Sequence, residues 1–528
     1  MKVITKIPLS ELPNTPPLVV DFLNSKLEFA QSFLWNNENI KAKIEEKQNQ
    51  FSQTSRDTLV DVLRHQLQDL QLSEKQSANL KILEKPTSFT ITTGHQLNLF
   101  SGPVFFIYKI LQVIKSCEEL NDKNTNQHFV PIFWMATEDH DFLEINHFKT
   151  EKSLYQFSEK AGNAVGRITI TDLDFIKQFE KEFEDSLFGK DLIALLKSTF
   201  LLGESLTQAT RKLVQNLFSD YGLLMIDGDC AELKKMMIPI FQQELFDNSL
   251  MNNTASTVTQ IKNNYGKVQV NPREINLFYL SETRNRIEFY NNKFHIVDTD
   301  LSFTKEEISQ ELHAFPEKFS PNALLRPVFQ EMILPNIAYI GGNAEIAYWL
   351  ELPLYFQSIN LTFPLLIPRN SFQILTEKVN GKIEKLGLSI RDFFDENPKL
   401  YQKIFTENHA LSSTINENEE LVKSAFQSLL SQASLTDKSY EQLVLAEQTR
   451  QLKSFEKMRK RLLKAEKIKH KEKLERIENL FELIIPNEIW QERQYNFSVY
   501  YSQFGRRWIA DCYKNISVDN SNLIVVAQ

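Results

Sequence analysis

Polar or glycine-rich sequence follows each of five short apolar runs in this chain. The runs read FTIT (residues 89–92), VPIFWM (130–135), LLMI (223–226), IAYI (337–340) and PLLI (364–367). The residues directly after them are, in the same order, Thr93–Asn98, Ala136–Asp141, Asp227–Asp229, Gly341–Glu345 and Pro368–Asn370. Short apolar runs separated by helical patterns are typical of a parallel sheet that is covered on both faces. Since ligands of such sheets bind beyond the carboxyl ends of the strands, the sequence predicts one polar site at that edge.

The loop after the first run is rich in groups that can hold an anion. His95, Gln96 and Asn98 carry polar side chains, and Gly94 lets the backbone approach a ligand closely. His95 could simply cap the helix that follows, which would leave it outside the chemistry. The alternative is that His95 donates a hydrogen bond to a phosphate or acyl oxygen.

The loop after the second run concentrates carboxylates and imidazoles. Glu138, Asp139, His140 and Asp141 are consecutive, and His147 follows shortly after. Carboxylate and imidazole suit several divalent metal ions, so the cluster could bind a metal. Acids at the end of a strand also commonly cap the next helix. Both interpretations stay open at the level of sequence.

Two arginines and a pair of glycines lie beside the later runs. Arg326 and Arg369 could each belong to a buried ion pair, or could bind a carboxylate or phosphate through two parallel hydrogen bonds. The pair Gly341-Gly342 allows close approach of the backbone to a ligand, although a tight turn alone also requires it.

Composition places the chain among ordinary folded proteins. It has 528 residues, of which 42% are hydrophobic and 24% are charged, and a formal net charge of −8. The negative charge argues against a nucleic-acid-binding surface. The three cysteines (Cys117, Cys230 and Cys512) form neither a disulfide framework nor a C-x-x-C pair. No apolar segment opens the chain or reaches membrane-spanning length, so we expect a cytoplasmic protein without a membrane partner.

The elements that must position these residues form a doubly wound α/β core. We expect this Rossmann-like core over residues 1–370, with insertions at about 138–199 and 231–325, because both gaps are far longer than a simple crossover. The second insertion contains RIEFYNNKFHIVD, which alternates around Asn-Asn as a hairpin does. Two helices are predicted from their starts: one has Pro103 at its first position, and Ser205 opens the other.

Helical sequence dominates residues 371–485, and residues 486–528 are predicted to return to the core. The stretch Leu435–Leu483 is long, charged and nearly free of helix breakers, with an apolar stripe along one side. A preceding helix from about Glu419 to Gln432 could run antiparallel to it. We expect a coiled-coil arm that serves as a dimer contact or as a lever.

Six longer stretches resemble the BshC family, the cysteine ligases of bacillithiol biosynthesis. They are TTGHQLNLFSGPVFFIYK, VPIFWMATEDHDFLEINH, YGLLMIDGD, SPNALLRPVFQEMILPNIAYIGGNAEIAYWLEL, PLLIPRNS and IPNEIWQERQYNF, in this order between about Phe89 and Phe497. The chain departs from the family pattern at His95-Gln96, where Gln-Gln is expected. The resemblance implies a Rossmann-like core with connecting-peptide insertions, and a helical coiled-coil arm that forms a homodimer.

The resemblance also implies the reaction, in which the carboxyl group of cysteine is joined to the amine of glucosaminyl-malate to give bacillithiol. A free carboxylate must be activated before it forms an amide in water, so we expect ATP or another nucleotide, which Mg²⁺ could accompany. The residues expected to be catalytic are His95, Asp139 and His140. Asp139 or Asp141 would hold the cysteine ammonium, and His140 would accept the proton of the attacking amine.

The other expected contacts form two sets. Arg326 or Arg369 would bind the malate carboxylate. The full set of expected substrate-binding residues is Gln96, Asn98, Glu138, Asp141, Arg326, Gln330, Glu345, Arg369 and Asn370. The expected nucleotide-binding residues are Thr93, Gly94, Asp227, Gly341 and Gly342. By analogy with class I synthetase-type folds, the loop at 93–96 would hold the phosphates of the nucleotide.

Two other classes of function remain open. A metal-dependent hydrolase would use as its metal ligands His95, Glu138, Asp139, His140 and Asp141. A non-catalytic scaffold would keep the fold, bind a partner of the thiol pathway through the arm and show no turnover.

Overall fold

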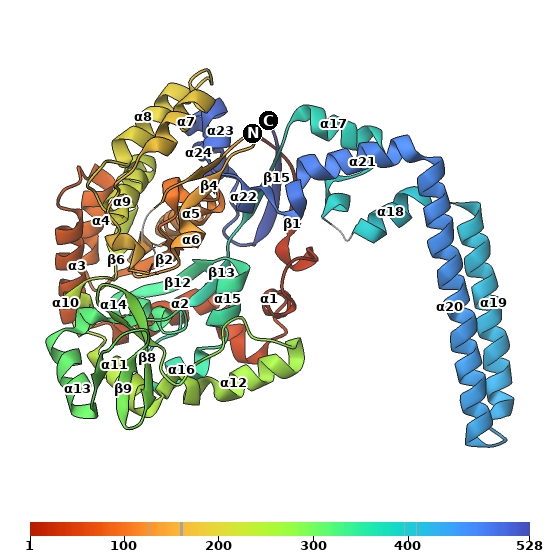
Figure 1. Cartoon of the computed structure of the whole chain (residues 1–528), viewed down its shortest axis with the longest axis horizontal. Helices are drawn as coiled ribbons and strands as arrows, with labels where there is room; N and C mark the ends of the chain where they lie inside the picture. The colour runs from red at the N-terminus through yellow and green to blue at the C-terminus, as the bar shows by residue number, and fades with distance from the viewer. Residues whose placement is uncertain (125, 159–161, 395–396, 408) are drawn as a thin grey trace. The chain divides into compact units, whose positions relative to one another are not determined.

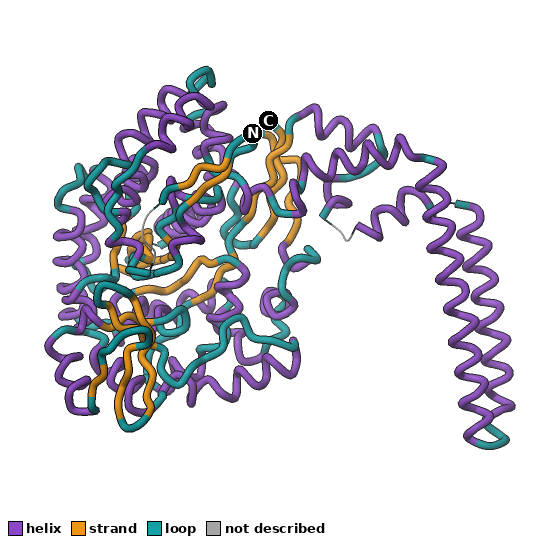
Figure 2. Tube along the Cα trace, viewed as in Figure 1, coloured by secondary structure: helices purple, strands orange, loops and turns teal. Residues whose placement is uncertain are grey.

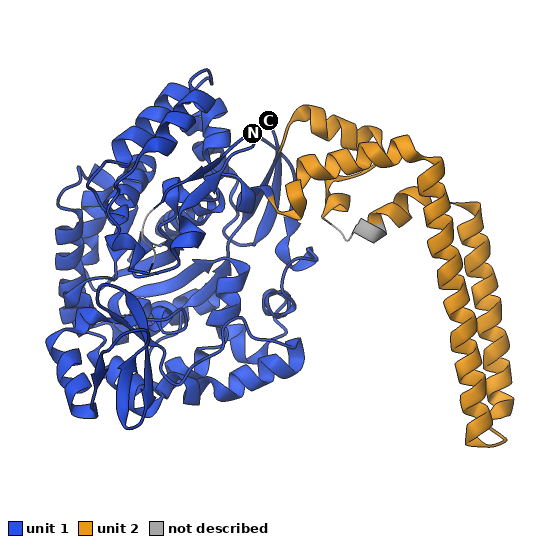
Figure 3. Ribbon diagram, viewed as in Figure 1, with its two compact units in different colours: residues 1–374, 491–528 blue, residues 375–490 orange. Residues whose placement is uncertain are grey.

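The computed structural model describes every residue of the chain except 125, 159–161, 395–396 and 408 (Figure 1). The described residues form two compact units (Figure 3). Residues 1–374 and 491–528 make up one unit, which we call the core, and residues 375–490 make up the other, which we call the arm. The sequence interpretation put the corresponding limits at residues 370 and 485. None of the described helices combines the length and the apolar composition needed to cross a membrane.

The centre of the core is a five-stranded parallel sheet. From one edge to the other its strands are β13 (Leu365–Pro368), β12 (Asn336–Gly341), β2 (Ser88–Gln96), β3 (His128–Ala136) and β6 (Leu224–Asp227). Each of the five apolar runs supplies one of these strands, so the predicted parallel sheet is confirmed. Chain order along the sheet reverses between β2 and β12, and at such a switch point an open parallel sheet leaves a crevice for a ligand.

Both faces of this sheet are covered. Every residue from Ser88 to Gly94 is buried, so the middle strand β2 has no side that faces solvent. The helices that pack against the strands are α5 (Phe105–Lys123) on β2 and β3, α4 (Glu74–Leu83) on β3 and β6, α3 (Gln53–Leu67) on β6, and α2 (Asn37–Gln50) on β12 and β13. Burial on both faces explains why the five strands are apolar throughout instead of alternating.

The two helix starts predicted from sequence have different outcomes. The prediction for Pro103 is wrong, because α5 begins at Phe105. The backbone has positive φ throughout Phe100–Gly102, so the chain turns sharply just before Pro103 and reaches helical geometry later. The prediction for Ser205 is confirmed: its hydroxyl caps α9 (Leu206–Phe218) in a capping box.

The two insertions add walls beside the parallel sheet. The first contains α6 (Phe142–Ile145), β4 (His147–Lys149), β5 (Leu154–Gln156), α7 (Asp174–Phe183) and α8 (Gly189–Thr199). The second contains an antiparallel sheet in the order β10 (Ser302–Phe303), β9 (Lys293–Ile296), β8 (Arg284–Tyr290), β7 (Leu277–Leu280) and β11 (Phe319–Pro321). The predicted hairpin is confirmed, because β8 and β9 pair around Asn291 and Asn292, both of which have positive φ.

The remaining core elements complete the surroundings of the sheet. The helices of the second insertion are α10 (Ala231–Lys235), α11 (Ile238–Asp247), α12 (Ser249–Tyr265) and α13 (Lys305–Ala314), and α14 (Arg326–Ile333) follows directly after it. The other helices are α1 (Pro17–Leu23), α15 (Asn343–Trp349), α16 (Pro353–Ser358), α22 (Gln491–Gln494), α23 (Ser498–Phe504) and α24 (Arg506–Asn515). The two chain ends pair in a third sheet, in the order β1 (Lys2–Pro8), β15 (Asn522–Ala527) and β14 (Ser371–Leu375).

The described part of the arm consists of helices joined by turns and loops (Figure 2). Its helices are α17 (Glu377–Lys385), α18 (Asn397–Phe405), α19 (Ala410–Ala433), α20 (Lys438–Lys469) and α21 (Lys471–Ile484). The predicted antiparallel pair is formed by α19 and α20, where Arg459 contacts Asn416 at 2.9 Å and also pairs with Glu419. The stretch Leu435–Leu483 forms two helices, α20 and α21, because the backbone leaves helical geometry at His470 (φ −111°, ψ 40°).

Candidate active site

A cavity of about 420 Å³ lies at the carboxyl ends of the parallel strands. The part of its lining that follows the strands comprises Gly94–Gln96 after β2, Ala136–Asp139 after β3, Gly228 after β6, Gly342 and Glu345 after β12, and Arg369 after β13. All five polar loops therefore contribute to one cavity, which includes the switch point between β2 and β12.

Four cations line one side of this cavity, and we call them the basic wall. They are Lys109, Arg326, Arg369 and Arg493. Lys109 Nζ lies 2.7 Å from Glu345 Oε2, and Arg369 forms a bidentate pair with Glu492 at 2.8 and 2.7 Å. Among the residues that the structure describes, Arg326 and Arg493 form no ion pair with a carboxylate. The basic wall therefore carries more positive than negative charge.

Glu345 connects the strands on either side of the switch point. It accepts hydrogen bonds from Lys109 Nζ, from Tyr339 Oη at 2.8 Å and from the N–H of Gly342 at 2.7 Å. Removal from water disfavours the charged carboxylate, but Lys109 and these hydrogen bonds outweigh it and lower the pKa of Glu345 to about 2. Lys109 also donates to the carbonyl of Gly94 at 2.6 Å, so this ion pair ties the end of β2 to the end of β12.

Arg369 is fully engaged by the protein through its terminal nitrogens. Besides Glu492, its Nη1 donates to Asn370 O and Ser371 Oγ, each at 3.1 Å, and its guanidinium lies 4.7 Å from the ring of Phe105. Asn370 faces the polypeptide instead of the cavity: its amide donates to Ser517 O, and its carbonyl accepts from the N–H of Asn522. Of the two alternatives for Arg369, the structure thus shows the buried ion pair.

Arg326 is held differently, by the neutral side chains of Gln330 and Tyr348 instead of by a carboxylate. Nη1 donates to Gln330 Oε1 at 3.0 Å, whereas the buried Nη2 has no hydrogen-bond partner among the described residues. The guanidinium carbon lies 5.8 Å from the ring of Trp134, 5.3 Å from that of Tyr339 and 6.0 Å from that of Trp349. A guanidinium stacked among aromatic rings with an unused N–H group is suited to binding an anion.

His95 lines the cavity as a neutral imidazole. Its ring packs between Phe105 and Phe106, with centroid distances of 5.2 and 5.1 Å. Burial, reinforced by the charge of Lys109, lowers the pKa of His95 to about 3. Its buried Nε2 has no partner among the described residues. His95 therefore does not cap α5, whose cap residue is Val104, and one of its ring nitrogens is available to a ligand.

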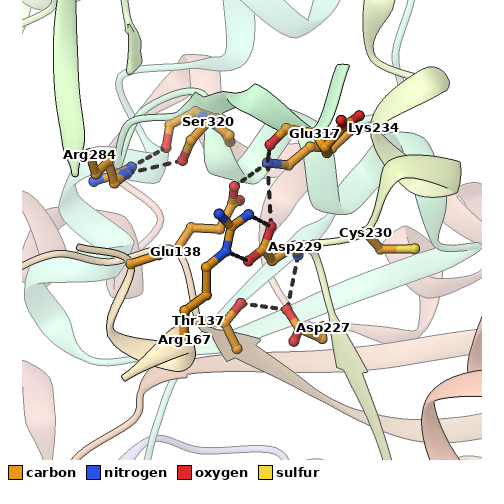
Figure 4. A network of polar contacts seen from close by, with 12 residues as sticks. Thr137, Glu138, Arg167, Asp227, Asp229, Cys230, Lys234, Arg284, Glu317 and Ser320 are labelled. Carbon is orange, nitrogen blue, oxygen red and sulfur yellow. Dashed lines mark hydrogen bonds and ion pairs between the residues drawn. The ribbon is translucent and has the colours of Figure 1, made fainter. Parts of the chain in front are cut away.

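The opposite side of the cavity, which we call the acidic wall, is lined by Glu138 and Asp139, with the cation Arg284 beside them (Figure 4 shows the network behind it). Glu138 pairs with the buried Lys234, whose Nζ also donates to Glu317 O at 3.0 Å. Behind this pair, Arg167 forms a bidentate pair with Asp229 at 2.7 Å for both contacts. Glu138 is thereby fixed as a carboxylate at the cavity surface.

Asp227 stands behind the acidic wall and outside the cavity lining. It accepts a hydrogen bond from the hydroxyl of Thr137 and another, at 2.9 Å, from the N–H of Asp229. Burial, together with the negative charge of Asp229, raises the pKa of Asp227 to about 6. Asp227 therefore braces β6 against β3, and the structure does not place it where it would touch a ligand in the cavity.

Asp139 and His140 lie where this cavity adjoins a second one of about 1030 Å³. Burial opposes ionisation of Asp139, but hydrogen bonds from His140 and Gln96 and the charge of Arg284 outweigh it, so its pKa lies well below the usual range. The two cavities share Asp139, Arg284, Asn322 and Ala323. His140 Nδ1 lies 3.0 Å from Arg284 Nη1, which can only donate, so Nδ1 accepts and the proton of the neutral ring is on Nε2.

The side chains of the remaining residues proposed from sequence are mainly engaged in contacts within the protein. Thr93 Oγ1 donates to Ile340 O at 2.7 Å, and Asp141 caps α6 by accepting from the N–H of Glu144. Asn98 packs beneath Gly102, where any added Cβ would lie 2.5 Å from the amide nitrogen of Asn98. Gln330 orients Arg326, and Gly341 ends β12 just outside the cavity lining. Gln96 lines the cavity but donates to Asp139 at 2.7 Å and Glu144 at 3.0 Å.

Sequence reasoning missed four charged residues at or beside the cavity: Lys109, Lys234, Arg284 and Arg493. One of them had a usable signal. Lys109 stands alone in the apolar run VFFIYKILQV, and a charge in a buried helix must be paired. The strand that begins at Arg284 gives no comparable indication, because its position beside His140 depends on how the second insertion folds back on the core.

The hydrolase alternative required five residues to act as ligands of one metal ion. Within the described part of the chain, no group of three or more His, Cys, Asp and Glu side chains is arranged to hold a metal ion. Glu138 pairs with Lys234, Asp141 caps a helix, and His95 lies on the basic side beside Lys109. The geometry therefore does not favour a metal-dependent hydrolase.

Two family models match the chain. The model described as "Bacillithiol biosynthesis BshC, N-terminal Rossmann-like domain" matches residues 4–370, and "Bacillithiol biosynthesis BshC, C-terminal coiled-coil domain" matches residues 372–527. A protein of Flavobacterium johnsoniae is 41% identical over 93% of both chains, and one of Christiangramia forsetii is 40% identical over 97% of this chain and 96% of its own. Both bear the name "Putative cysteine ligase BshC". The chain belongs to the BshC family.

Proposed function

We propose that this protein joins the carboxyl group of cysteine to the amine of glucosaminyl-malate in the last step of bacillithiol biosynthesis. The family and the names of the relatives support a cysteine ligase. The observation that carries the proposal is the cavity at the switch point, which has a basic wall on one side and an acidic wall on the other. Such a cavity suits reactants that carry both carboxylates and an ammonium group.

Arg326 is the proposed binding residue for the malate carboxylate. Its Nη2 is a buried donor without a partner among the described residues, and a carboxylate would supply the missing acceptor. Arg369 and Glu345 are proposed to keep the basic wall in place, because both are already paired within the protein. Arg493 adds positive charge at the same wall.

Asp139 is the proposed partner of the cysteine ammonium. It is ionised, lines the cavity and keeps part of its side chain exposed. Glu138 has a similar position but already neutralises Lys234, so it contributes less to binding a second cation. A carboxylate held by several N–H donors stays fixed in place while it attracts the ammonium.

His140 is the proposed acceptor for the proton of the attacking amine. The proton would enter at Nδ1, the ring nitrogen that Arg284 now occupies, so binding of the substrates must first displace that contact. Asp139 Oδ1 lies 3.6 Å from the same nitrogen and would stabilise the imidazolium that forms. The neutral His95 is proposed to donate from its free ring nitrogen to an oxygen of the activated carboxyl group.

Activation of the cysteine carboxylate is proposed to use ATP or another nucleotide, with Mg²⁺ as its counter-ion. When bound, a nucleotide supplies a leaving group that makes amide formation favourable. Gly94, Gly342 and His95 are the proposed contacts, because they line the cavity beside the unpaired donor of Arg326. A Cβ at Gly94 would come within 3.4 Å of Tyr339 Oη and 3.5 Å of Arg326 Nη1, so glycine keeps this side of the cavity open.

The protein is further proposed to act in the cytoplasm as a homodimer joined through the arm. Several apolar side chains of the arm are exposed, including Leu421 (68%), Leu443 (61%) and Ile468 (69%), and a second copy would cover them. Light scattering should give a dimer for the full chain and a monomer after deletion of residues 419–483. A full-length chain that stays monomeric at tens of micromolar would contradict the dimer.

Turnover tests the proposed reaction directly. Purified protein is incubated with cysteine, glucosaminyl-malate and ATP, and bacillithiol, AMP and ADP are quantified. We expect bacillithiol to accumulate in proportion to one adenine product, with no product when any one substrate is omitted. Release of AMP would indicate an acyl-adenylate route, and release of ADP an acyl-phosphate route. Absence of bacillithiol with every nucleotide tested would reject the proposal.

A further inference from the structure

A buried polar network extends from the cavity into the interior of the core, beneath Arg326. Lys47 Nζ donates to Glu331 O at 3.1 Å and lies 3.3 Å from Glu331 Oε2. Glu331 Oε1 accepts from Gln330 Nε2 at 2.9 Å and from Asn336 Nδ2 at 2.7 Å. Both partners of the ion pair are at most 1% exposed, although burying a charged pair seldom adds stability. Its retention beneath the cavity therefore suggests a purpose other than stability.

The network leaves the amide of Gln330 with one possible orientation. Glu331 is flanked by Lys47 and two amide N–H groups, so it acts as an acceptor and requires the nitrogen end of Gln330. The oxygen end of Gln330 must then face Arg326, whose Nη1 it accepts at 3.0 Å. With Nη1 committed to Gln330, Nη2 is the nitrogen left without a partner among the described residues. Lys47 thus fixes Glu331, Glu331 fixes the amide of Gln330, and Gln330 fixes the orientation of Arg326.

A second set of hydrogen bonds fixes the same network to the sheet. Asn336, the first residue of β12, accepts from Thr92 Oγ1 at 2.9 Å and from Thr90 Oγ1 at 3.2 Å through its carbonyl oxygen, so its nitrogen end must also face Glu331. These threonines lie on β2, on the other side of the switch point. The network therefore holds the C-terminal part of α14, the helix that begins at Arg326, against both central strands.

We propose that the Lys47–Glu331 pair is a positioning device that, through Gln330, directs Nη2 of Arg326 at an anionic group of the substrate. Neither Lys47 nor Glu331 lines the cavity, so their effect on the ligand passes entirely through Gln330 and Arg326. The inference rests on the proposed function only for the identity of the anion, which is the malate carboxylate of glucosaminyl-malate. The orientation of Arg326 itself does not depend on which anion binds.

The key variant is Glu331→Gln, which keeps the shape of the side chain and removes its charge. The amide of Gln330 is then free to turn, and Arg326 loses its fixed acceptor. We expect the dissociation constant for glucosaminyl-malate, measured by calorimetry, to rise about tenfold, and KM to rise with it. The rate at saturating substrate should stay within about threefold of the wild type, because the reacting groups are untouched. Glu331→Asp, which keeps the charge, should restore most of the affinity.

The matched control is Glu351→Gln. Glu351 is also a fully buried acidic side chain that accepts from backbone N–H groups, those of Gln269 and Val270, but it forms no hydrogen bond with Arg326 or Gln330 in the described part of the chain. Burial raises the pKa of Glu351 to about 7, so near neutral pH the replacement changes a side chain that is already partly protonated. Whatever its effect on stability, Glu351→Gln should leave KM unchanged. Equal effects of Glu331→Gln and Glu351→Gln on KM would show that Glu331 acts only on stability and would overturn the proposal.

A crystal structure of ligand-free Glu331→Gln separates this inference from the proposed reaction. We expect the Gln330 amide to be turned or disordered and the contact between Arg326 Nη1 and Gln330 Oε1 to be lost. An unchanged contact at 3.0 Å would overturn the inference even if the enzyme makes bacillithiol. A lost contact would support it even if glucosaminyl-malate proves not to be the substrate.

Discussion

The two walls of the cavity hold their charges in different ways. On the basic wall, the side chains of Lys109 and Arg369 are only 2% and 4% exposed, and each is tied to a carboxylate of the protein. On the acidic side, the side chains of Asp139 and His140 are 28% and 40% exposed and adjoin the second cavity. A dry wall in which two of the four cations are fixed by ion pairs is suited to holding a substrate group still. A wall open to solvent is suited to groups that must exchange protons.

This difference predicts which substitutions lower the stability of the fold and which lower the rate of the reaction. Removing a partner from the basic wall leaves an unpaired charge out of water, so it should damage the fold. Removing Asp139 or His140 takes away a partly exposed side chain, so the fold should tolerate the change while the reaction suffers. Glu138 is the exception on this side, because its partner Lys234 is buried.

The largest expected effect concerns Asp139→Asn and His140→Ala. Loss of a positioned proton acceptor or of its partner should lower the rate of bacillithiol formation about 10²–10⁴-fold, with the melting temperature nearly unchanged. Asp141→Ala is the control, because Asp141 caps α6 and lies outside the cavity lining: it should cost about 0.5–2 kcal/mol of stability and little activity. Near-normal turnover of folded Asp139→Asn would remove Asp139 from the mechanism.

Glu492→Gln should instead act on stability. The variant leaves the guanidinium of Arg369 buried without its bidentate partner, which should lower the free energy of unfolding by about 3–5 kcal/mol in urea titrations. Asp174→Asn, which removes an exposed ion pair with Lys177, should leave the midpoint unchanged. An unchanged urea midpoint for Glu492→Gln would contradict the conclusion that Glu492 holds Arg369 in the basic wall.

The buried His95 should make the stability of the fold depend on pH. The unfolded chain takes up a proton at His95 near pH 6.5, whereas the folded chain stays neutral there until about pH 3. Stability should therefore fall as the pH drops from about 6.5 towards 3, by roughly 1 kcal/mol per pH unit from this group. Asp227, whose pKa is raised to about 6, acts in the opposite direction between about pH 4 and 6, so the wild-type curve alone is ambiguous.

The difference between wild type and His95→Gln isolates the imidazole. Glutamine cannot titrate, so the stability of the variant relative to wild type should rise as the pH is lowered from 6.5. Thermal unfolding at pH 7.5 and pH 5 measures this. A difference that is the same at both pH values would mean that the pKa of His95 is the same in the folded and unfolded chains, and would contradict the buried neutral imidazole.

The smallest effect is expected for the cysteines, which lie outside both walls. Burial raises the pKa of Cys230 to about 11, so its thiol is a poor nucleophile, and Cys117 and Cys512 are buried in the core. Replacement of all three by Ala or Ser should leave turnover within about tenfold, provided that the protein folds. Complete loss of activity in folded Cys230→Ser would contradict this.

The sheet and the place of the site were predictable because they depend on local patterns. Five apolar runs with polar ends determine a parallel sheet and the edge at which its loops meet, and a capping box marks the start of α9. The start of α5 was not predictable from Pro103, because positive φ at Phe100 and Ser101 depends on packing around that loop. Likewise, the break at His470 lies inside a sequence that has no helix breaker.

The pairing of charges was the least predictable feature. Arg326 and Arg369 look alike in the sequence, yet Arg369 meets Glu492 from a helix more than a hundred residues away, while Arg326 meets the neutral Gln330 one turn along its own helix. Which arginine stays free for a ligand therefore depends on long-range contacts. The same holds for Lys234, which reaches Glu138 from the second insertion.

The central claim is that each wall holds one reactant, and calorimetric titration of each reactant into two variants tests it most directly. Arg326→Met should weaken binding of glucosaminyl-malate at least tenfold and leave binding of cysteine nearly unchanged. Asp139→Asn should weaken binding of cysteine and spare glucosaminyl-malate. If both variants weaken both reactants equally, or if the two effects are exchanged, the assignment of the walls is contradicted.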